Sequence, residues 1–263
     1  MSARQRGHLI VAVAFLVIGV SGPLVRMADA PESVLIVIRM ASAAIVVAAF
    51  SARRRTLAPA FQSGIAGRLL LMGACSASSI LLFFVALRGT DVAMALFLLY
   101  TSPVYVALLA PFALGEPSHR VVYLALTVAL TGMAVIVMPD LLGRATEASP
   151  AGIAAGIGAG ALFAFYTMVA KTMTRRLGNR VLLLSETALD ALFILPLALW
   201  QIGVQGYSVT GRDLVIGLVL GLVCTVFAYA LWYEGIRHIP VQHASILGYL
   251  ALVSGPVCAF FLL

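Results

Sequence analysis

Hydrophobic residues occur in long unbroken runs along the chain, and the charged residues gather in the short stretches between them. A run such as VVYLALTVALTGMAVIVM at 121–138 shows no alternation of polar and apolar positions. It therefore predicts a helix, because a strand of a membrane barrel would show about ten residues of alternating hydrophobicity. A helix needs about 20 apolar residues to cross a bilayer. Nine segments approach or exceed this length, at 8–27, 33–51, 68–88, 92–115, 120–139, 151–173, 181–202, 213–234 and 241–263.

The composition fits a chain that folds in lipid. Hydrophobic residues make up 62% of the 263 residues and charged residues only 10%, whereas about a quarter of a soluble domain is charged. Lipid offers the backbone no hydrogen-bonding partner, so only helices and closed barrels can span it. We therefore predict an all-α membrane protein whose first partner is the lipid bilayer, without a separate soluble domain.

The cationic residues are distributed unevenly between the two ends of the predicted spans. If the N-terminus is cytoplasmic, twelve of the 17 lie at inner ends and four at outer ends, as the positive-inside rule requires. We predict that the loops at 52–66 and 174–180 face the cytoplasm, that the 140–150 loop faces outward, and that the membrane is the plasma (inner) membrane. This asymmetry accounts for the net charge of +7, so we expect no nucleic-acid partner.

The chain also contains an internal repeat. Residues 69–114 and 218–263 are identical at thirteen of 46 positions when aligned without gaps. The matches that biased composition explains least are Cys75 with Cys224, Arg88 with Arg237, and Tyr100 with Tyr249.

The offset between the two copies is five spans, an odd number, so the copies must cross the membrane in opposite directions. Inverted repeats of this kind are typical of secondary transporters, which bind substrate between the halves near the midplane. We predict two five-helix halves, at 1–140 (spans 1–5) and at 141–263 (spans 6–9). The same register expects a tenth helix to begin near position 269, after the last residue of the sequence.

Three segments resemble the EamA-type repeat of the drug/metabolite transporter superfamily: ALRGTDVAMALFLLYTSPVYVALLAPFALGE at 86–116, WYEGIRHIPVQHASILGYLALV at 232–253 and LIVIRMASAA at 35–44. The resemblance covers essentially the whole chain as two copies. It implies ten helices, a central cavity and the movement of a metabolite or drug, often as export. The second copy departs from the first by having Leu252 where the first has Pro103.

The stretch GVSGPLVR at 19–26 supports three interpretations of Ser21. A catalytic serine of an intramembrane hydrolase would need a base such as His238 or His243 within hydrogen-bond reach. A structural interpretation is a helix kink, because Pro23 removes one backbone hydrogen bond. The transport interpretation adds that Ser21 faces the central cavity, and it is compatible with the kink.

Other polar and aromatic side chains recur at helical spacing within the spans. Ser245 and Tyr249 share one face of the last span, and Tyr100 is the repeat counterpart of Tyr249. Helix–helix hydrogen bonds or an aromatic belt at the membrane interface are the alternatives. With Ser21, the substrate-binding candidates are Tyr100, Tyr166, Tyr229, Trp232, Ser245 and Tyr249.

Arg39, Glu186 and Asp190 are ionisable residues within predicted spans. Such residues are costly in lipid and normally face the protein interior. From the helical rise of about 1.5 Å per residue, Arg39 and Asp190 differ by about 5 Å in depth, so we predict that they pair. A coupling role, in which one carboxylate takes up a proton, is the alternative.

We predict a secondary transporter that moves a small metabolite or drug-like molecule by alternating access. The sequence contains no phosphate-binding glycine-rich loop with a lysine, and the cysteine spacing matches no metal motif. We therefore expect no cofactor, no metal and no enzymatic activity. The alternatives are the intramembrane hydrolase and a non-transporting membrane scaffold, and a homodimer is retained as a possible assembly.

Overall fold

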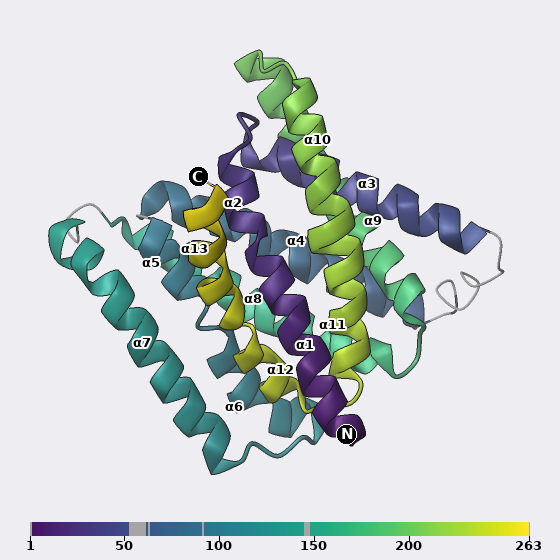
Figure 1. Cartoon of the computed structure of the whole chain (residues 1–263), viewed down its shortest axis with the longest axis vertical. Helices are drawn as coiled ribbons and strands as arrows, with labels where there is room; N and C mark the ends of the chain where they lie inside the picture. The colour runs from purple at the N-terminus through teal and green to yellow at the C-terminus, as the bar shows by residue number, and fades with distance from the viewer. Residues whose placement is uncertain (1, 53–61, 63, 91, 145–147, 263) are drawn as a thin grey trace.

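The computed structural model describes the whole chain except residues 1, 53–61, 63, 91, 145–147 and 263 (Figure 1). The predicted loops at 52–66 and 140–150 therefore lie partly outside the described residues. The first half of the chain forms α1 (Ala3–Gly19), α2 (Ser21–Arg26), α3 (Glu32–Ala52), α4 (Ile65–Gly89), α5 (Val92–Leu99), α6 (Ser102–Leu114) and α7 (Arg120–Arg144). The second half forms α8 (Pro150–Thr174), α9 (Asn179–Gln205), α10 (Gly211–Val219), the π-helical segment η3 (Leu220–Phe227), α11 (Ala228–Ile236), α12 (Val241–Leu247) and α13 (Leu250–Leu262).

Eight helical segments in the described part of the chain are long and apolar enough to cross a membrane, and α7 adds a shorter apolar stretch, Arg120–Val135. The all-helical membrane fold predicted from the hydrophobic runs is confirmed.

The helix ends follow local chemistry. The Ser149 side chain caps α8 by accepting a hydrogen bond from the backbone of Gly152, and Pro150 occupies the first turn, where its missing N–H costs nothing. At the other ends, α6 and α9 stop at Gly115 and Gly206, which have φ angles of 66° and 65°. Glycine adopts this left-handed conformation without steric penalty and so terminates these helices.

Two predicted spans are broken at positions related by the repeat. The fourth span divides into α5 and α6 at Tyr100–Thr101, and the ninth divides into α12 and α13 at Gly248–Tyr249. The run lengths alone predicted neither break, although Ser102 and Pro103 follow Tyr100, with Pro103 in the first turn of α6, and Gly248 lies at the second break. Tyr100 and Tyr249, which are equivalent in the aligned copies, therefore both lie at a helix break.

The two halves of the chain pack crosswise. Helix α3 lies against α9, while α4 runs along α8 and α1 runs along α11 (Figure 1). The broken helices follow the same rule, since α5 and α6 pack on α8, and α12 and α13 pack on α1. The contacts that α8 makes with α4, α5 and α6 therefore correspond to those that α1 makes with α11, α12 and α13, as an inverted repeat requires.

Glycine allows the close approach of the broken helices to their neighbours. A Cβ atom on Gly19 of α1 would lie 2.6 Å from the backbone oxygen of Ala251 in α13, and one on Gly160 of α8 would lie 2.8 Å from that of Leu98 in α5. Small residues at such crossings let helix backbones pack closely in membranes. These two contacts hold α1 and α8 beside the two helix breaks.

Candidate functional site

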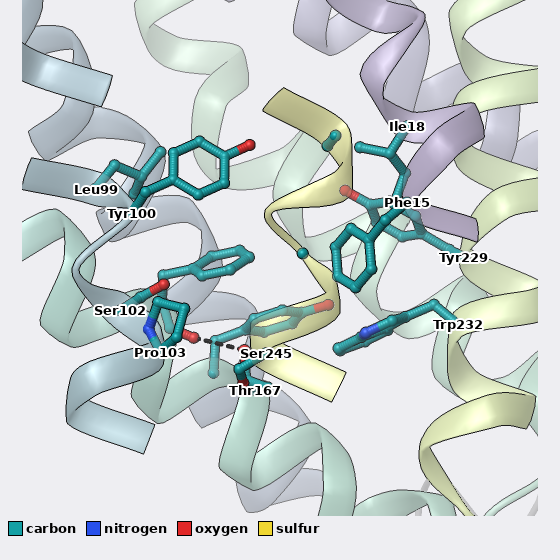
Figure 2. A pocket seen from close by; sticks show the side chains of 14 residues that line it. Phe15, Ile18, Leu99, Tyr100, Ser102, Pro103, Thr167, Tyr229, Trp232 and Ser245 are labelled. Atoms are coloured by element: carbon teal, nitrogen blue, oxygen red, sulfur yellow. Dashed lines mark hydrogen bonds between the residues drawn. The ribbon is translucent and has the colours of Figure 1, made fainter. Parts of the chain in front are cut away.

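A cavity of about 130 Å³ lies where the two broken helices meet α1, α8 and α11. In Figure 2, Leu99, Tyr100, Ser102 and Pro103 lie on one side of this space, and Phe15, Ile18, Tyr229 and Trp232 lie opposite. Fourteen residues line the cavity: Phe15, Ile18, Leu99, Tyr100, Ser102, Pro103, Phe163, Tyr166, Thr167, Tyr229, Trp232, Ser245, Gly248 and Ala251. The lining therefore combines residues of both halves.

The two helix breaks contact each other at the edge of this cavity. The Tyr249 hydroxyl donates a hydrogen bond of 2.8 Å to the backbone oxygen of Tyr100, and the two rings lie 5.9 Å apart. Irregular backbone is tolerated at membrane depth only where it is enclosed by protein or lines a cavity. The breaks meet this condition because Leu99, Tyr100 and Gly248 all line the cavity.

Aromatic side chains form one wall of the cavity. The rings of Tyr166 and Trp232 stack at 5.8 Å with an angle of 15°, Phe163 lies 5.6 Å from Tyr166, and Tyr229 lies 6.4 Å from Trp232. These four rings come from α8 and α11, so the wall joins two helices that are far apart in sequence.

A buried carboxyl group lies directly behind this wall. Glu186 on α9 is only 1% exposed and accepts hydrogen bonds from the hydroxyls of Tyr166 and Tyr233. The Tyr166 phenol therefore links the cavity surface to an ionisable group.

Asp190 lies one helical turn further along α9 and is equally buried. Its Oδ2 atom accepts a hydrogen bond of 3.0 Å from Ser76 on α4, while Oδ1 is buried without a hydrogen-bonding partner. An unsatisfied buried oxygen costs free energy. The two carboxyl groups form one buried acidic pair, whose Glu186 member is the one bonded to the cavity wall.

Arg39 on α3 has other partners than the predicted one. Its Nε atom donates a hydrogen bond of 2.6 Å to the Thr225 hydroxyl, and its Nη2 atom donates one of 3.3 Å to the backbone oxygen of Cys224. Both acceptors belong to η3. The predicted pairing with Asp190 was based only on the similar depths of the two residues in the membrane. In the structure the guanidinium of Arg39 donates to acceptors in η3 instead. Arg39 interacts with both carboxyl groups over a longer range.

The structure brings five of the seven predicted binding residues to one cavity: Tyr100, Tyr166, Tyr229, Trp232 and Ser245. Tyr249 lies at its edge, where it bonds to Tyr100. Ser21 is half-buried at the start of α2, just after the helix is interrupted at Val20, and is not among the lining residues. The role of each residue in binding stays a prediction.

The histidines proposed as partners of a catalytic Ser21 are bonded elsewhere. The His243 ring lies 2.9 Å from His8, and the His238 ring lies 3.2 Å from a Glu234 oxygen. A serine nucleophile needs its base within hydrogen-bond reach, so this arrangement does not favour the hydrolase.

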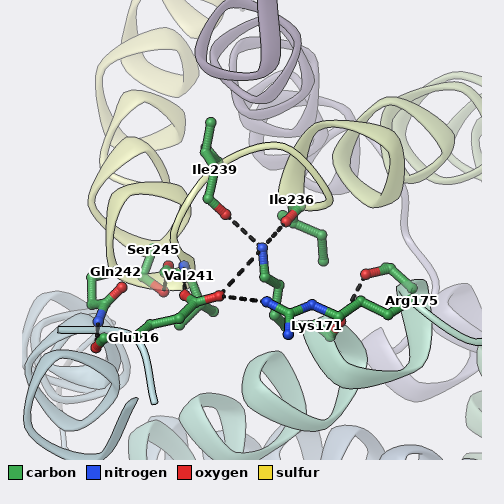
Figure 3. Close-up of polar contacts among 9 residues, drawn as sticks. Glu116, Lys171, Arg175, Ile236, Ile239, Val241, Gln242 and Ser245 are labelled. Atoms are coloured by element: carbon green, nitrogen blue, oxygen red, sulfur yellow. Dashed lines mark hydrogen bonds and ion pairs between the residues drawn. The ribbon is translucent and has the colours of Figure 1, made fainter. Parts of the chain in front are cut away.

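A polar cluster of Glu116, Lys171, Arg175 and Gln242 lies at the end of the bundle where α6 ends and α12 begins, here termed the α6/α12 end (Figure 3). Glu116 forms ion pairs with Lys171 at 3.6 Å and with Arg175 at 3.1 Å. The second carboxylate oxygen of Glu116 accepts a hydrogen bond of 2.8 Å from the backbone N–H of Val241. The cluster therefore joins the α6–α7 connection to α8 and α12.

Lys171 also connects this cluster to the turn between α11 and α12. The side chain is only 3% exposed, and its ammonium donates to the backbone oxygens of Ile236 and Ile239. Sequence reasoning missed the cluster because it treated Lys171 only as a charge for topology. The usable signal was that Glu116 and Lys171, of opposite charge, both lie at predicted inner ends.

The described part of the chain is a bundle of membrane-spanning helices in two repeats, with a central cavity where the broken helices meet. The chain belongs to the EamA-like transporter family, which matches residues 5–138 and again residues 150–263. The second match confirms the repeat that the sequence predicted.

Two curated relatives are similar over 180 residues, or 68% of this chain. An uncharacterized transporter, YwfM, of Bacillus subtilis (strain 168) is 28% identical over that length, and an uncharacterized transporter of Archaeoglobus fulgidus is 27% identical. These matches span 59% and 62% of the relatives' own length, less than two thirds. A solved crystal structure matches 98% of this chain and 89% of its own, with a TM-score of 0.78 and 20% identity, which shows the fold alone.

Proposed function

We propose that this protein is a secondary transporter that carries a small solute through the cavity between its halves by alternating access. One observation carries the proposal: the broken helices of both repeats meet at a cavity lined by both halves. Solute sites at discontinuous helices between inverted repeats are the recurring arrangement of secondary transporters. A non-transporting scaffold would not require such a cavity.

The packing of the broken helices supports a state that is closed at one end. At the α6/α12 end, α12 packs against both α6 and α7, and the Glu116 cluster reinforces this contact. At the opposite end α13 packs on α1 and α2, whereas α5 packs on α8 and α7. With the predicted orientation, the closed end is cytoplasmic and the state faces outward. Export is the proposed direction, from the resemblance of the sequence to the drug/metabolite transporters.

The buried acidic pair is the proposed coupling element. A carboxyl group can exchange a proton as the solute binds and leaves, and Glu186 is bonded to Tyr166, which lines the cavity. Arg39 lies close enough to influence both carboxyl groups and limits the charge that they place in the membrane. A pH gradient would then drive transport.

Ser245→Trp should abolish transport, because an indole in place of a hydroxymethyl group fills a cavity of about 130 Å³. The test is an uptake and efflux screen of metabolites in proteoliposomes, with and without a pH gradient. Ser208→Trp is the matched control, because Ser208 is exposed in a connection away from the cavity. A solute moved equally by wild type and Ser245→Trp would contradict transport through this cavity.

The proposed orientation gives a separate prediction. On a cysteine-free background, Arg176→Cys should react with an impermeant maleimide only in inverted vesicles, and Ser208→Cys only in intact cells. Both positions are exposed and lie at opposite ends of α9. Labelling of Arg176→Cys in intact cells would reverse the proposed orientation.

A further inference from the structure

We propose that the turn between α8 and α9 binds the head group of an anionic phospholipid, with an acyl chain of the lipid lying along α9. This second site lies outside the central cavity, and it does not depend on the proposed transport function. It follows from three properties of the turn: a cavity lined by arginines, the uncapped start of α9 and a row of apolar side chains that leads away from both.

A cavity of about 400 Å³ lies at this turn and is here termed the arginine cavity. Six of its seven lining residues are consecutive, from Arg176 to Val181, and the seventh is Arg237 at the end of α11. Three of these seven residues are arginines and none is acidic. A lining of this kind favours a negatively charged occupant.

The three arginines differ in how they are held. Nη2 of Arg237 donates a hydrogen bond of 2.6 Å to the backbone oxygen of Leu177, and Nη1 lies 3.9 Å from a carboxylate oxygen of Glu234. Arg176 and Arg180 are exposed, and neither is paired with a carboxylate in the described part of the chain. Three arginines beside one carboxylate leave two positive charges in excess at the turn.

The first turn of α9 adds backbone donors to the same cavity. No side chain caps this helix start, and the first helical hydrogen bonds run from Val181 and Leu182 to the oxygen of Gly178. The N–H groups of Asn179 and Arg180 precede these bonds, and such free N–H groups at a helix start bind phosphate. Because Gly178, Asn179 and Arg180 line the arginine cavity, these donors and the arginine side chains serve one occupant.

The surface of α9 distinguishes a lipid from a soluble phosphate. Leu184, Ala188 and Leu192 follow Arg180 at steps of four residues, and residues with this spacing form a ridge on a helix. Leu184 is half-buried, Ala188 is exposed and Leu192 is 62% exposed. The ridge extends about 18 Å from Arg180 into the membrane-spanning part of the helix. An acyl chain can therefore lie along this ridge while the phosphate stays at the arginines.

The net charge of the head group decides which lipid the turn prefers. The proposed orientation places the arginine cavity at the cytoplasmic end of the bundle, where basic pockets between membrane helices bind anionic head groups. Phosphatidylglycerol carries a net negative charge. Phosphatidylcholine has the same phosphate, but its positive choline cancels the charge. The two excess positive charges at the turn therefore favour phosphatidylglycerol.

Native mass spectrometry of the full chain in detergent measures the binding of single lipid molecules. The probes are phosphatidylglycerol, phosphatidylcholine with the same acyl chains, and soluble glycerol phosphate. We expect one phosphatidylglycerol to bind with a dissociation constant at least about tenfold below that of phosphatidylcholine. Glycerol phosphate at the concentration of the lipid should displace neither.

Two double variants locate the site. Arg176→Gln/Arg180→Gln removes the two exposed arginines and should bring the dissociation constants of the two lipids within about threefold of each other. Arg26→Gln/Arg212→Gln removes two exposed arginines at the opposite end of the bundle and should keep the wild-type preference. In lipid nanodiscs, wild-type backbone hydrogen exchange at 176–181 should be slower by at least about threefold in phosphatidylglycerol than in phosphatidylcholine.

Equal binding of the two lipids by wild type, or an unchanged preference in Arg176→Gln/Arg180→Gln, would overturn the inference. Loss of the preference in Arg26→Gln/Arg212→Gln as well would also overturn it, because net charge alone would then explain the result. Displacement of phosphatidylglycerol by glycerol phosphate would assign the turn to a soluble phosphate instead of a lipid. None of these outcomes decides transport through the central cavity, which Ser245→Trp tests separately.

Discussion

Lys171→Met should open the α6/α12 end of the bundle. The methionine keeps a long side chain but removes the ion pair with Glu116 and both hydrogen bonds to the 236–239 turn. Removing one partner of a buried ion pair typically costs about 3–5 kcal/mol, or at least about a hundredfold in an equilibrium constant. Backbone hydrogen exchange at the start of α12 should therefore accelerate by at least about a hundredfold, as measured by mass spectrometry.

Arg175→Gln is the matched control for this prediction. Arg175 also pairs with Glu116, but its side chain is 63% exposed, and exposed ion pairs contribute less than about 1 kcal/mol. Its exchange rates should stay within about fivefold of wild type. If Lys171→Met behaves like Arg175→Gln, the cluster does not hold this end closed.

Glu186→Gln should uncouple transport from the pH gradient. Glutamine has nearly the same shape as glutamate but cannot take up a proton, so solute exchange should persist while gradient-driven accumulation falls by about a hundredfold or more. Glutamine offers one acceptor oxygen where the carboxylate offers two, so one of the two phenols would lose its acceptor, at a cost of about 1–3 kcal/mol in stability. Proteoliposome transport with and without a pH gradient, beside solute exchange at equal pH, measures both effects.

Two further variants make this result specific. Glu186→Asp retains a titratable group and should keep gradient-driven transport at a reduced rate. Asp190→Asn tests the other carboxyl group, which is bonded to Ser76 rather than to the cavity wall. Full gradient-driven transport by Glu186→Gln, with its loss in Asp190→Asn, would transfer the coupling role to Asp190.

The fold could be predicted largely because hydrophobic run length is a physical requirement of the bilayer. The helix breaks do not follow from run length. Pro103 after Tyr100 and Gly248 before Tyr249 were local signals, but the contact between the two tyrosines depends on the packing of the two halves. The π-helical segment η3 was not predicted either. It packs against α3, where a Cβ atom on Gly221 of η3 would lie 2.7 Å from the backbone oxygen of Arg39.

The candidate site shows where one-dimensional reasoning ends. The repeat and the mid-span position selected Tyr100 and Tyr166, and both line the cavity. Arg39 received the wrong partner, because depth along the membrane normal does not say which way a helix face points. The Glu116–Lys171 pair joins residues 55 positions apart in sequence across two halves, and its formation depends on the crosswise packing of the helices.

The accessibility of Ser245 from the two sides of the membrane tests alternating access most directly. Ser245→Cys, in a chain whose three other cysteines are replaced, is treated with an impermeant maleimide in right-side-out and in inverted vesicles. The account predicts labelling from both sides, faster from outside in wild type, with Lys171→Met raising the rate from the cytoplasmic side. Labelling from one side only, unchanged by Lys171→Met, would contradict it.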